Sequence, residues 1–255
     1  MVRHAHAFCA PINVGFAVPN MKPFAYFGTS HITALGLIPV VSLLLVVLAG
    51  RHSRRITCIR RLLAALLAIN WSLWMLLLYA NGWLDVGNAL PLNLCDWATV
   101  ATILALLDPV QRFYDLSFFW ALCGTLQALV TPDCRFDFPD RQFILFFVYH
   151  DTIIISVIFL ALAERMRPYL SSMRRVTGWS LLYAGAAGCA DWILGTDYGF
   201  LKAKPTHPSL LDYMAPWPWY LPELFLAGIF FMALWYTPFA IGDLMRGRKL
   251  DWQPV

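Results

Sequence analysis

The hydrophobic positions of this chain are gathered into seven long runs that are separated by shorter polar links. The runs cover residues 31–50, 60–80, 92–107, 115–130, 143–163, 176–195 and 221–241. Most of them approach the roughly 18–20 apolar residues that an α-helix needs to cross a hydrocarbon core of about 30 Å. The pattern predicts an all-α fold, a polytopic membrane bundle of seven transmembrane helices.

Turn residues and charges mark where these runs end. Asn81-Gly82 ends the second run and Asp108-Pro109 ends the third. We expect residues 1–30 to form an extracytoplasmic N-terminal segment, 31–241 the transmembrane domain and 242–255 a basic cytoplasmic tail.

The composition supports a membrane protein and leaves no stretch for a second, soluble domain. Hydrophobic residues make up 60% of the chain and charged residues 13%, against about 25% charged in an ordinary soluble domain. The net charge of +4 would suit an acidic partner. Because the basic residues lie almost entirely between the apolar runs, they indicate topology, and we expect no nucleic-acid partner.

The distribution of lysine and arginine predicts the orientation of the bundle. If the seven runs alternate in direction, 13 of these residues fall on one side and 6 on the other. The positive-inside rule then places the N-terminus outside and the C-terminus in the cytoplasm.

The six cysteines show no spacing typical of a metal centre, because neither Cys-x-x-Cys nor a close Cys/His pattern occurs. We therefore expect no metal and no other cofactor. Cys9 and Cys134 fall on the same predicted side of the membrane, so the predicted topology permits a disulfide between them.

One polar pair stands out at the start of the third run. Cys95 and Asp96 lie there together, and an aspartate at the centre of a spanning helix costs typically about 2.5–3.5 kcal/mol. A cysteine can attack an acyl carbonyl when a nearby imidazole accepts its proton, and His150 lies on the same predicted side. The plainer interpretation is that Cys95 is a small buried hydrophobe and His150 a hydrogen-bonded core histidine.

Other polar side chains on this side are candidates for supporting roles. Asp96 and Asp151 could orient the histidine or make hydrogen bonds within the bundle, and His31 could be a second ring at the site or an interfacial residue. Asn93, Asp191, Asp197 and Tyr198 are expected to be supporting polar residues. Candidate substrate-binding residues are Gln127, Trp217, Trp219 and Lys204, although the two tryptophans also suit an interfacial aromatic belt and the lysine any membrane surface.

Several motifs, read together, resemble those of the YwaF family of integral membrane proteins. They run in order from His31 to Pro238 and include Leu90-Pro91-Leu92-Asn93-Leu94-Cys95, Trp120 to Asp133, Phe146-Phe147-Val148-Tyr149-His150, Gly195-Thr196-Asp197-Tyr198-Gly199 and Pro216-Trp217-Pro218-Trp219-Tyr220. That family is similar to an animal transmembrane acyltransferase that remodels ether phospholipids. The resemblance implies an enzyme with Cys95 as nucleophile and His150 as base. It would move a fatty acyl chain from a glycerophospholipid to a lysophospholipid through a thioester.

The predicted topology adds an expectation about the acyl donor. Cys95 would open to the extracytoplasmic half of what we expect to be a bacterial cytoplasmic membrane, where a phospholipid can reach it and cytosolic acyl-CoA cannot. Two other functions remain open. One is a membrane hydrolase of acyl esters, because water can also release an acyl-enzyme; the other is a small-solute transporter with His150, Asp151 and Asp191 along its path. The head group and the oligomeric state do not follow from the sequence.

Overall fold

A computed structural model describes residues 22–205 and 209–248, and this part of the chain is helical apart from its links and one isolated bridge between Pro23 and Phe136. The helices are α1 (Thr29–Ala49), α2 (Ser53–Ala80), α3 (Leu94–Leu107), α4 (Gln111–Trp120), the π-helical turn η1 (Ala121–Thr125), α5 (Leu126–Val130), α6 (Arg141–Ala163), α7 (Leu170–Leu194), the 3₁₀ turns η2 (Tyr198–Phe200) and η3 (Leu210–Tyr213), and α8 (Tyr220–Met245). The predicted all-α fold is confirmed for these residues. The N-terminal residues 1–21, with Cys9, and the last residues of the tail lie outside the described ranges.

Seven helical rods occupy the seven predicted runs, because α4, η1 and α5 form one continuous rod. Five rods are long and apolar enough to cross a membrane: α1, α2, Gln111–Val130, α6 and α8. The 14 residues of α3 span only about 21 Å at about 1.5 Å per residue, and α7 is long enough but less apolar. The chain is therefore an integral membrane protein by its helices, with five clear candidate spans.

Several helices begin or end beyond the apolar run that predicted them. The α2 helix begins at Ser53 rather than at 60, α7 begins at Leu170 rather than at 176, and α8 continues past 241 to Met245. Arginine is a good helix former, so a helix can continue into the charged region at its end. Hydrophobicity marks only the part of a helix that lies among lipid tails or in the core.

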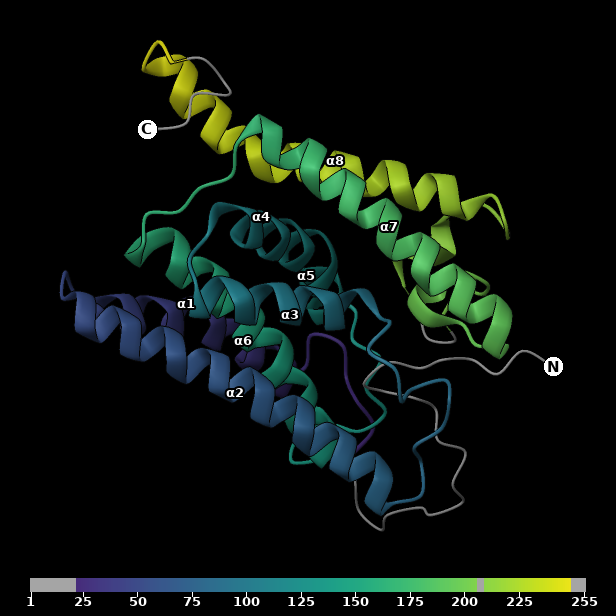
Figure 1. The fold of residues 1–255 in the computed structure, drawn as a ribbon. Helices are drawn as coiled ribbons and strands as arrows, with labels where there is room; N and C mark the ends of the chain where they lie inside the picture. Colours follow the sequence, from purple (N-terminus) through teal and green to yellow (C-terminus); the bar gives the residue numbers. More distant parts are fainter. Residues whose placement is uncertain (1–21, 206–208, 249–255) are drawn as a thin grey trace.

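The central helix of the bundle is α6. In its most apolar 18-residue stretch, 78% of the residues are buried, against 22% in α1 and 11% in α8. It packs against α1, α2 and α3 and against the α4–α5 rod. In Figure 1, α7 and α8 run side by side over α3, α4 and α5, while α1 and α2 lie on the other side of α6. The exposed apolar side chains of α1 and α8 are what a lipid-facing surface requires.

The rods alternate in direction, which divides the bundle into two ends. We call the end where α1, α3, α6 and α8 begin the Cys95 end, and the end where α2, α4 and α7 begin the Arg167 end. At the Arg167 end, Arg60 at the start of α2 donates to Glu164 just after α6 at 2.6 Å. Gln111 at the start of α4 donates through Nε2 to the Arg167 carbonyl at 2.8 Å. Helix starts and helix ends thus meet as an up-and-down bundle requires.

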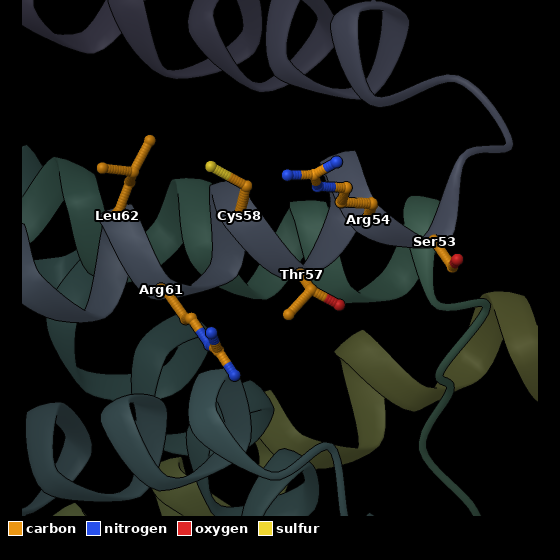
Figure 2. A pocket seen from close by; sticks show the side chains of 6 residues that line it. All are labelled: Ser53, Arg54, Thr57, Cys58, Arg61 and Leu62. Atoms are coloured by element: carbon orange, nitrogen blue, oxygen red, sulfur yellow. The ribbon is translucent and has the colours of Figure 1, made fainter.

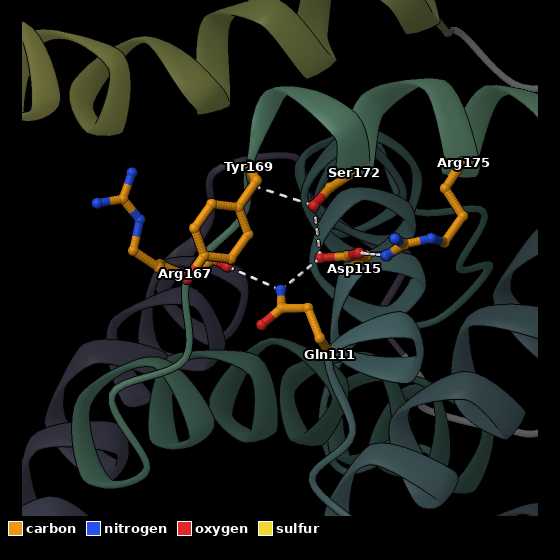
Figure 3. Close-up of polar contacts among 6 residues, drawn as sticks. All are labelled: Gln111, Asp115, Arg167, Tyr169, Ser172 and Arg175. Carbon is orange, nitrogen blue, oxygen red and sulfur yellow. Dashed lines mark hydrogen bonds and ion pairs between the residues drawn. The ribbon is translucent and has the colours of Figure 1, made fainter. Parts of the chain in front are cut away.

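A buried polar network also holds the Arg167 end together (Figure 3). The carboxylate of Asp115 on α4 is fully buried and accepts hydrogen bonds from Gln111, at 2.6 Å, and from Ser172 on α7, at 2.8 Å. It also forms an ion pair with Arg175. In the same region, Arg167 pairs with the buried Asp243 of α8, and this hydrogen bond raises the pKa of the Arg167 guanidinium above its usual value. The two buried carboxylates of this region, Asp115 and Asp243, are thus each paired with an arginine, as burial requires.

Candidate functional site

The start of α3 is set by a capping box that also positions the candidate nucleophile. Asn93 is the N-cap residue, and its backbone N–H donates to Asp96 Oδ2 at 3.0 Å. Such a reciprocal arrangement satisfies N–H groups that have no carbonyl partner in a first helical turn. Cys95 is the second residue of this helix, partly buried and packed against the core. Asp96 therefore has a capping role that the sequence analysis did not assign to it.

The α4–α5 rod closes one side of this turn. Gly124 lies in the π-helical turn, and a Cβ atom there would lie 3.0 Å from Leu94 Cδ2. The ring of Trp97 packs edge-on against Trp120, with centroids 6.2 Å apart. A side chain at this position would require Leu94 to move by a few tenths of an ångström, so glycine allows the close packing of the two helices. Turns of π-helix occur often at functional sites.

The central helix meets the same turn of α3 from another side. The Tyr149 hydroxyl donates to Asp96 Oδ1 over a long contact of 3.5 Å, and both residues are buried. His150 follows Tyr149 directly. Cys95 and His150, the two candidate catalytic residues, are therefore the immediate sequence neighbours of Asp96 and Tyr149, which contact each other across the two helices.

The hydrogen bond of His150 defines which ring nitrogen can act as a base. Its Nδ1 lies 2.8 Å from the Phe146 carbonyl oxygen, which can only accept, so Nδ1 carries the proton. The neutral ring then has its lone pair on Nε2, the tautomer that a general base needs. His150 is 2% exposed, and its ring lies tilted by 32° against that of Phe146, with ring centroids 4.1 Å apart.

A small, partly open cavity of about 10 Å³ lies beside Asp96. Its walls are Trp71, Trp74, Met75, Asn88, Leu90, Asn93 and Asp96. This volume is close to the minimum of roughly 10–15 Å³ for one water molecule. The cavity gives the carboxylate room for a single water between α2 and the start of α3.

The predicted supporting residues of the 191–203 region hold the loops that cover the Cys95 end. Asp191 Oδ1 accepts from Thr196 Oγ1 and from the Tyr198 backbone N–H, each at 2.7 Å. Asp197 Oδ1 accepts from the backbone N–H of Lys202 at 2.7 Å. Their described hydrogen bonds shape the loop itself.

Tyr198 joins this loop to the link before α3. Its hydroxyl donates to the Val86 carbonyl at 2.7 Å and accepts from the Leu90 N–H at 3.1 Å. Burial raises the pKa of this hydroxyl above its usual value, so it stays protonated and can donate. Asn93 Oδ1 accepts from the Gly199 N–H at 3.5 Å, which brings the same loop to the N-cap of α3.

The candidate substrate-binding residues lie in different surroundings. Lys204 Nζ donates to the Met214 carbonyl at 2.6 Å and lies 5.7 Å from the centre of the Tyr220 ring, so it braces the loop before α8. Trp217 and Trp219 are 58% and 67% exposed, as an aromatic belt requires. Gln127 is half-buried in α5.

Two further candidates are buried within the bundle. Asp151 is 7% exposed, and its Oδ1 has no hydrogen-bond partner among the described residues. His31 is fully buried, with Nδ1 accepting from the Phe27 N–H at 3.0 Å and Nε2 donating to the Leu129 carbonyl at 2.8 Å. Because both of its ring nitrogens are used, His31 joins α1 to α5 and has no nitrogen left to act as a base.

This leads to a prediction about stability. Replacing His31 by Ala removes two buried hydrogen bonds and the stacking of the ring on Phe27, so we expect the Tm of the protein in detergent to fall by about 5–10 °C. His52→Ala is the matched control, because His52 is exposed before α2. Thermal unfolding of both variants checks this, and an unchanged Tm for His31→Ala would contradict the joining role.

A larger hollow of about 460 Å³ lies elsewhere, on the surface of α2 near the Arg167 end. All six side chains that line it come from α2, and Figure 2 shows Arg54 and Arg61 extending to opposite sides of the helix. An open groove along one helix does not enclose a substrate, so we place the candidate site at Cys95.

Three residues near the candidate site were not predicted from the sequence: Tyr149, Gly124 and Tyr183. The ring of Tyr183 packs edge-on against Trp97, with ring centroids 5.4 Å apart. A signal was present for the tyrosines, since a buried hydroxyl in an apolar helix usually requires a partner.

Comparison with known proteins identifies the family of the chain. No curated protein and no solved structure matched it. The model of the TMEM164 family matches residues 26–236, which include every helix up to most of α8. The match also contains Cys95, Asp96, Tyr149 and His150. The chain therefore belongs to the TMEM164 family.

Proposed function

We propose that this protein is a membrane-embedded acyltransferase that moves a fatty acyl chain from a glycerophospholipid to a lysophospholipid through a thioester on Cys95. One observation carries the proposal. The contact between Asp96 and Tyr149 brings together the helical turns that bear Cys95 and His150. The hydrogen bond from His150 Nδ1 to the Phe146 carbonyl supports His150 as the base, because it leaves the lone pair on Nε2.

The resemblance to the YwaF family, and through it to the animal acyltransferase of ether phospholipids, supports the same chemistry. The motifs that carry this resemblance lie almost entirely within the residues matched by the TMEM164 family model.

The proposed reaction has two halves. His150 Nε2 accepts the thiol proton, the Cys95 sulfur attacks the ester carbonyl carbon, and the C–O bond to glycerol breaks as the leaving oxygen takes the proton from His150. The products are a lysophospholipid and acyl-Cys95. In the second half, the hydroxyl of another lysophospholipid loses its proton to His150 and attacks the thioester, and the thiol is restored. No net oxidation or hydrolysis occurs.

We further propose that all seven rods cross the membrane, with the N-terminus outside. The alternation of the rods supports this arrangement, and the excess of basic residues at the Arg167 end supports the orientation. The Cys95 end then faces outward, in what we infer is a bacterial cytoplasmic membrane. A phospholipid of the outer leaflet reaches Cys95 directly, so the donor is a lipid rather than acyl-CoA.

The test uses purified protein in nanodiscs. We expect label to pass from a phospholipid with a radioactive acyl chain to an added lysophospholipid, and to stay in the donor when the lysophospholipid is absent. Labelled acyl-CoA in nanodiscs of unlabelled diether lipid, which has no ester-linked chain to donate, is the second arm, and we expect no transfer from it. Transfer from acyl-CoA would overturn the lipid-donor proposal.

The water-sized cavity beside Asp96 favours a second candidate, a hydrolase that releases the acyl chain to water. The same experiment separates the two, since a hydrolase produces labelled free fatty acid at equal rates with and without lysophospholipid. A small-solute transporter is the remaining alternative, supported by the unpartnered Asp151 Oδ1. Retention of solute transport in a Cys95→Ala variant, with no lipid turnover in the wild type, would favour it.

A further inference from the structure

The hydroxyl of Tyr183 on α7 is a buried donor that the bundle leaves unused. The side chain is 6% exposed, and its hydroxyl has no hydrogen-bond partner among the described residues. An unmade hydrogen bond of a buried polar group costs about 1–3 kcal/mol. Such a group calls for an explanation, and one explanation is a partner that is present only during the reaction.

The surroundings of Tyr183 place this hydroxyl at the start of α3. Its ring packs edge-on against Trp97 and lies in one cluster with Leu94. The hydroxyl faces the backbone N–H of Leu94, the first residue of α3, and lies within electrostatic range of Cys95. The unused donor is thus directed to the turn that carries the candidate nucleophile.

The same turn supplies a further donor. The first N–H groups of a helix have no carbonyl partner within it, and they form the positive end of the helix dipole. The Cys95 sulfur faces the N–H groups of Cys95 and Asp96. The Asp96 N–H already donates to the Asn93 carbonyl at 3.0 Å, which leaves the Cys95 N–H as the available donor. A negative charge that develops on the oxygen of a carbonyl group whose carbon is bonded to the Cys95 sulfur would therefore lie beside the Cys95 N–H and the Tyr183 hydroxyl.

Gly199 explains how Tyr183 reaches this position. The glycine has φ 65°, and a Cβ atom there would lie 2.3 Å from the Tyr183 hydroxyl oxygen. Only glycine adopts this backbone conformation at low cost and also leaves the space that the hydroxyl occupies. The Gly199 N–H donates to Asn93 Oδ1, so the loop that accommodates Tyr183 is joined to the N-cap of α3.

We propose that the Tyr183 hydroxyl and the Cys95 backbone N–H at the start of α3 form an oxyanion hole for acyl transfer at Cys95. This inference rests on the proposed function. When the sulfur forms its bond to the carbonyl carbon, the π electron pair of the carbonyl moves to its oxygen. Tyr183 donates a hydrogen bond to this oxyanion and keeps its proton. When the pair returns to re-form the carbonyl, the C–O bond to glycerol breaks and the leaving oxygen takes the proton held by His150.

The test compares two tyrosine variants that each lose one buried, unpartnered hydroxyl. Tyr183→Phe removes the hydroxyl beside Cys95, whereas Tyr114→Phe removes an equally unpartnered one on α4 near the Arg167 end. Two probes are applied to each variant: a p-nitrophenyl acyl ester, which passes through a tetrahedral intermediate, and iodoacetamide, which alkylates the thiol without one. Label on Cys95 is followed by mass spectrometry.

We expect Tyr183→Phe to slow acylation of Cys95 by about 10²–10³-fold, the usual effect of losing one oxyanion donor. Alkylation by iodoacetamide should stay within about twofold, because the thiol itself is unchanged; Tyr114→Phe should leave both rates unchanged. As a second variant, Gly199→Ala displaces the Tyr183 hydroxyl and should also slow acylation more than alkylation.

The outcomes separate this inference from the proposed function. If wild-type Cys95 is acylated and Tyr183→Phe is acylated equally fast, the oxyanion hole is overturned and the acyltransferase proposal stands. If Tyr183→Phe slows acylation and alkylation to the same extent, Tyr183 acts on the thiol, and the oxyanion role is also overturned. If wild-type Cys95 is never acylated by the ester or by phospholipid, both proposals fall.

Discussion

We expect replacement of Cys95 by Ala to abolish transfer of the labelled acyl chain, with a fall of at least about 10⁴-fold, because the change removes the proposed covalent nucleophile. The protein should still fold, because Cys95 is a small, partly buried residue at the second position of α3, where Ala is a better helix former. The measurement is transfer from a labelled phospholipid to a lysophospholipid in nanodiscs, with Tm as the folding check.

Matched controls for this result are Cys58→Ala and Cys189→Ala, which remove exposed thiols on α2 and α7. Both should retain full transfer. His150→Gln should also lose most of the activity, because Gln has no basic nitrogen to accept the thiol proton. Full activity in Cys95→Ala would refute the thioester mechanism.

Replacing Asp115 by Ala should give the largest loss of stability among single changes at the Arg167 end. The fully buried carboxylate accepts from Gln111, Ser172 and Arg175, so its removal leaves donors from two helices without their acceptor. Breaking a buried ion pair by removing one partner costs about 3–5 kcal/mol, and because Arg175 can partly reach water we expect about 3 kcal/mol. At about 2–4 °C per kcal/mol for a chain of this size, the Tm falls by about 6–12 °C.

The control is Asp108→Ala, because Asp108 is exposed at the end of α3. Its Tm should stay within about 1 °C of the wild type, as for most surface changes. Asp115→Asn should fall between the two, since the amide oxygen can still accept one of the bonds. Equal Tm values for Asp115→Ala and wild type would show that the network of Figure 3 does not join α4 to α7.

Hydrophobic runs predicted all seven helical rods, because a helix among lipid tails or in a bundle core needs apolar residues over most of its length. The ends of the rods were predicted less well. The α2 helix begins at Ser53, well before its apolar run, because the hydrogen bonds of a helix do not depend on the hydrophobicity of its residues. For α3, which is short, and α7, which is less apolar, the position in the membrane depends on packing against the neighbouring helices rather than on hydrophobicity alone.

The candidate site was predicted only in part. The cost of a polar residue in an apolar run drew attention to Cys95, Asp96 and His150, but periodicity says nothing about which helices face each other. The second hydrogen bond of His31, to Leu129, and the loop contacts of Asp191 and Asp197 depend on a partner that is distant in sequence or on loop geometry. The capping role of Asp96 depends on Asn93, three residues earlier, and is a local motif that we did not predict.

By itself the sequence determined that this chain is an all-helical membrane protein with a thiol and a carboxylate at the start of its third apolar run, because composition and periodicity act locally along the chain. Only the tertiary structure decided which groups surround that thiol. It brought Tyr149 of α6 to Asp96 and directed the Tyr183 hydroxyl to the start of α3 through the space left at Gly199. These contacts join residues 53 and 89 positions apart, and they arise from helix packing, which no local pattern in the chain encodes.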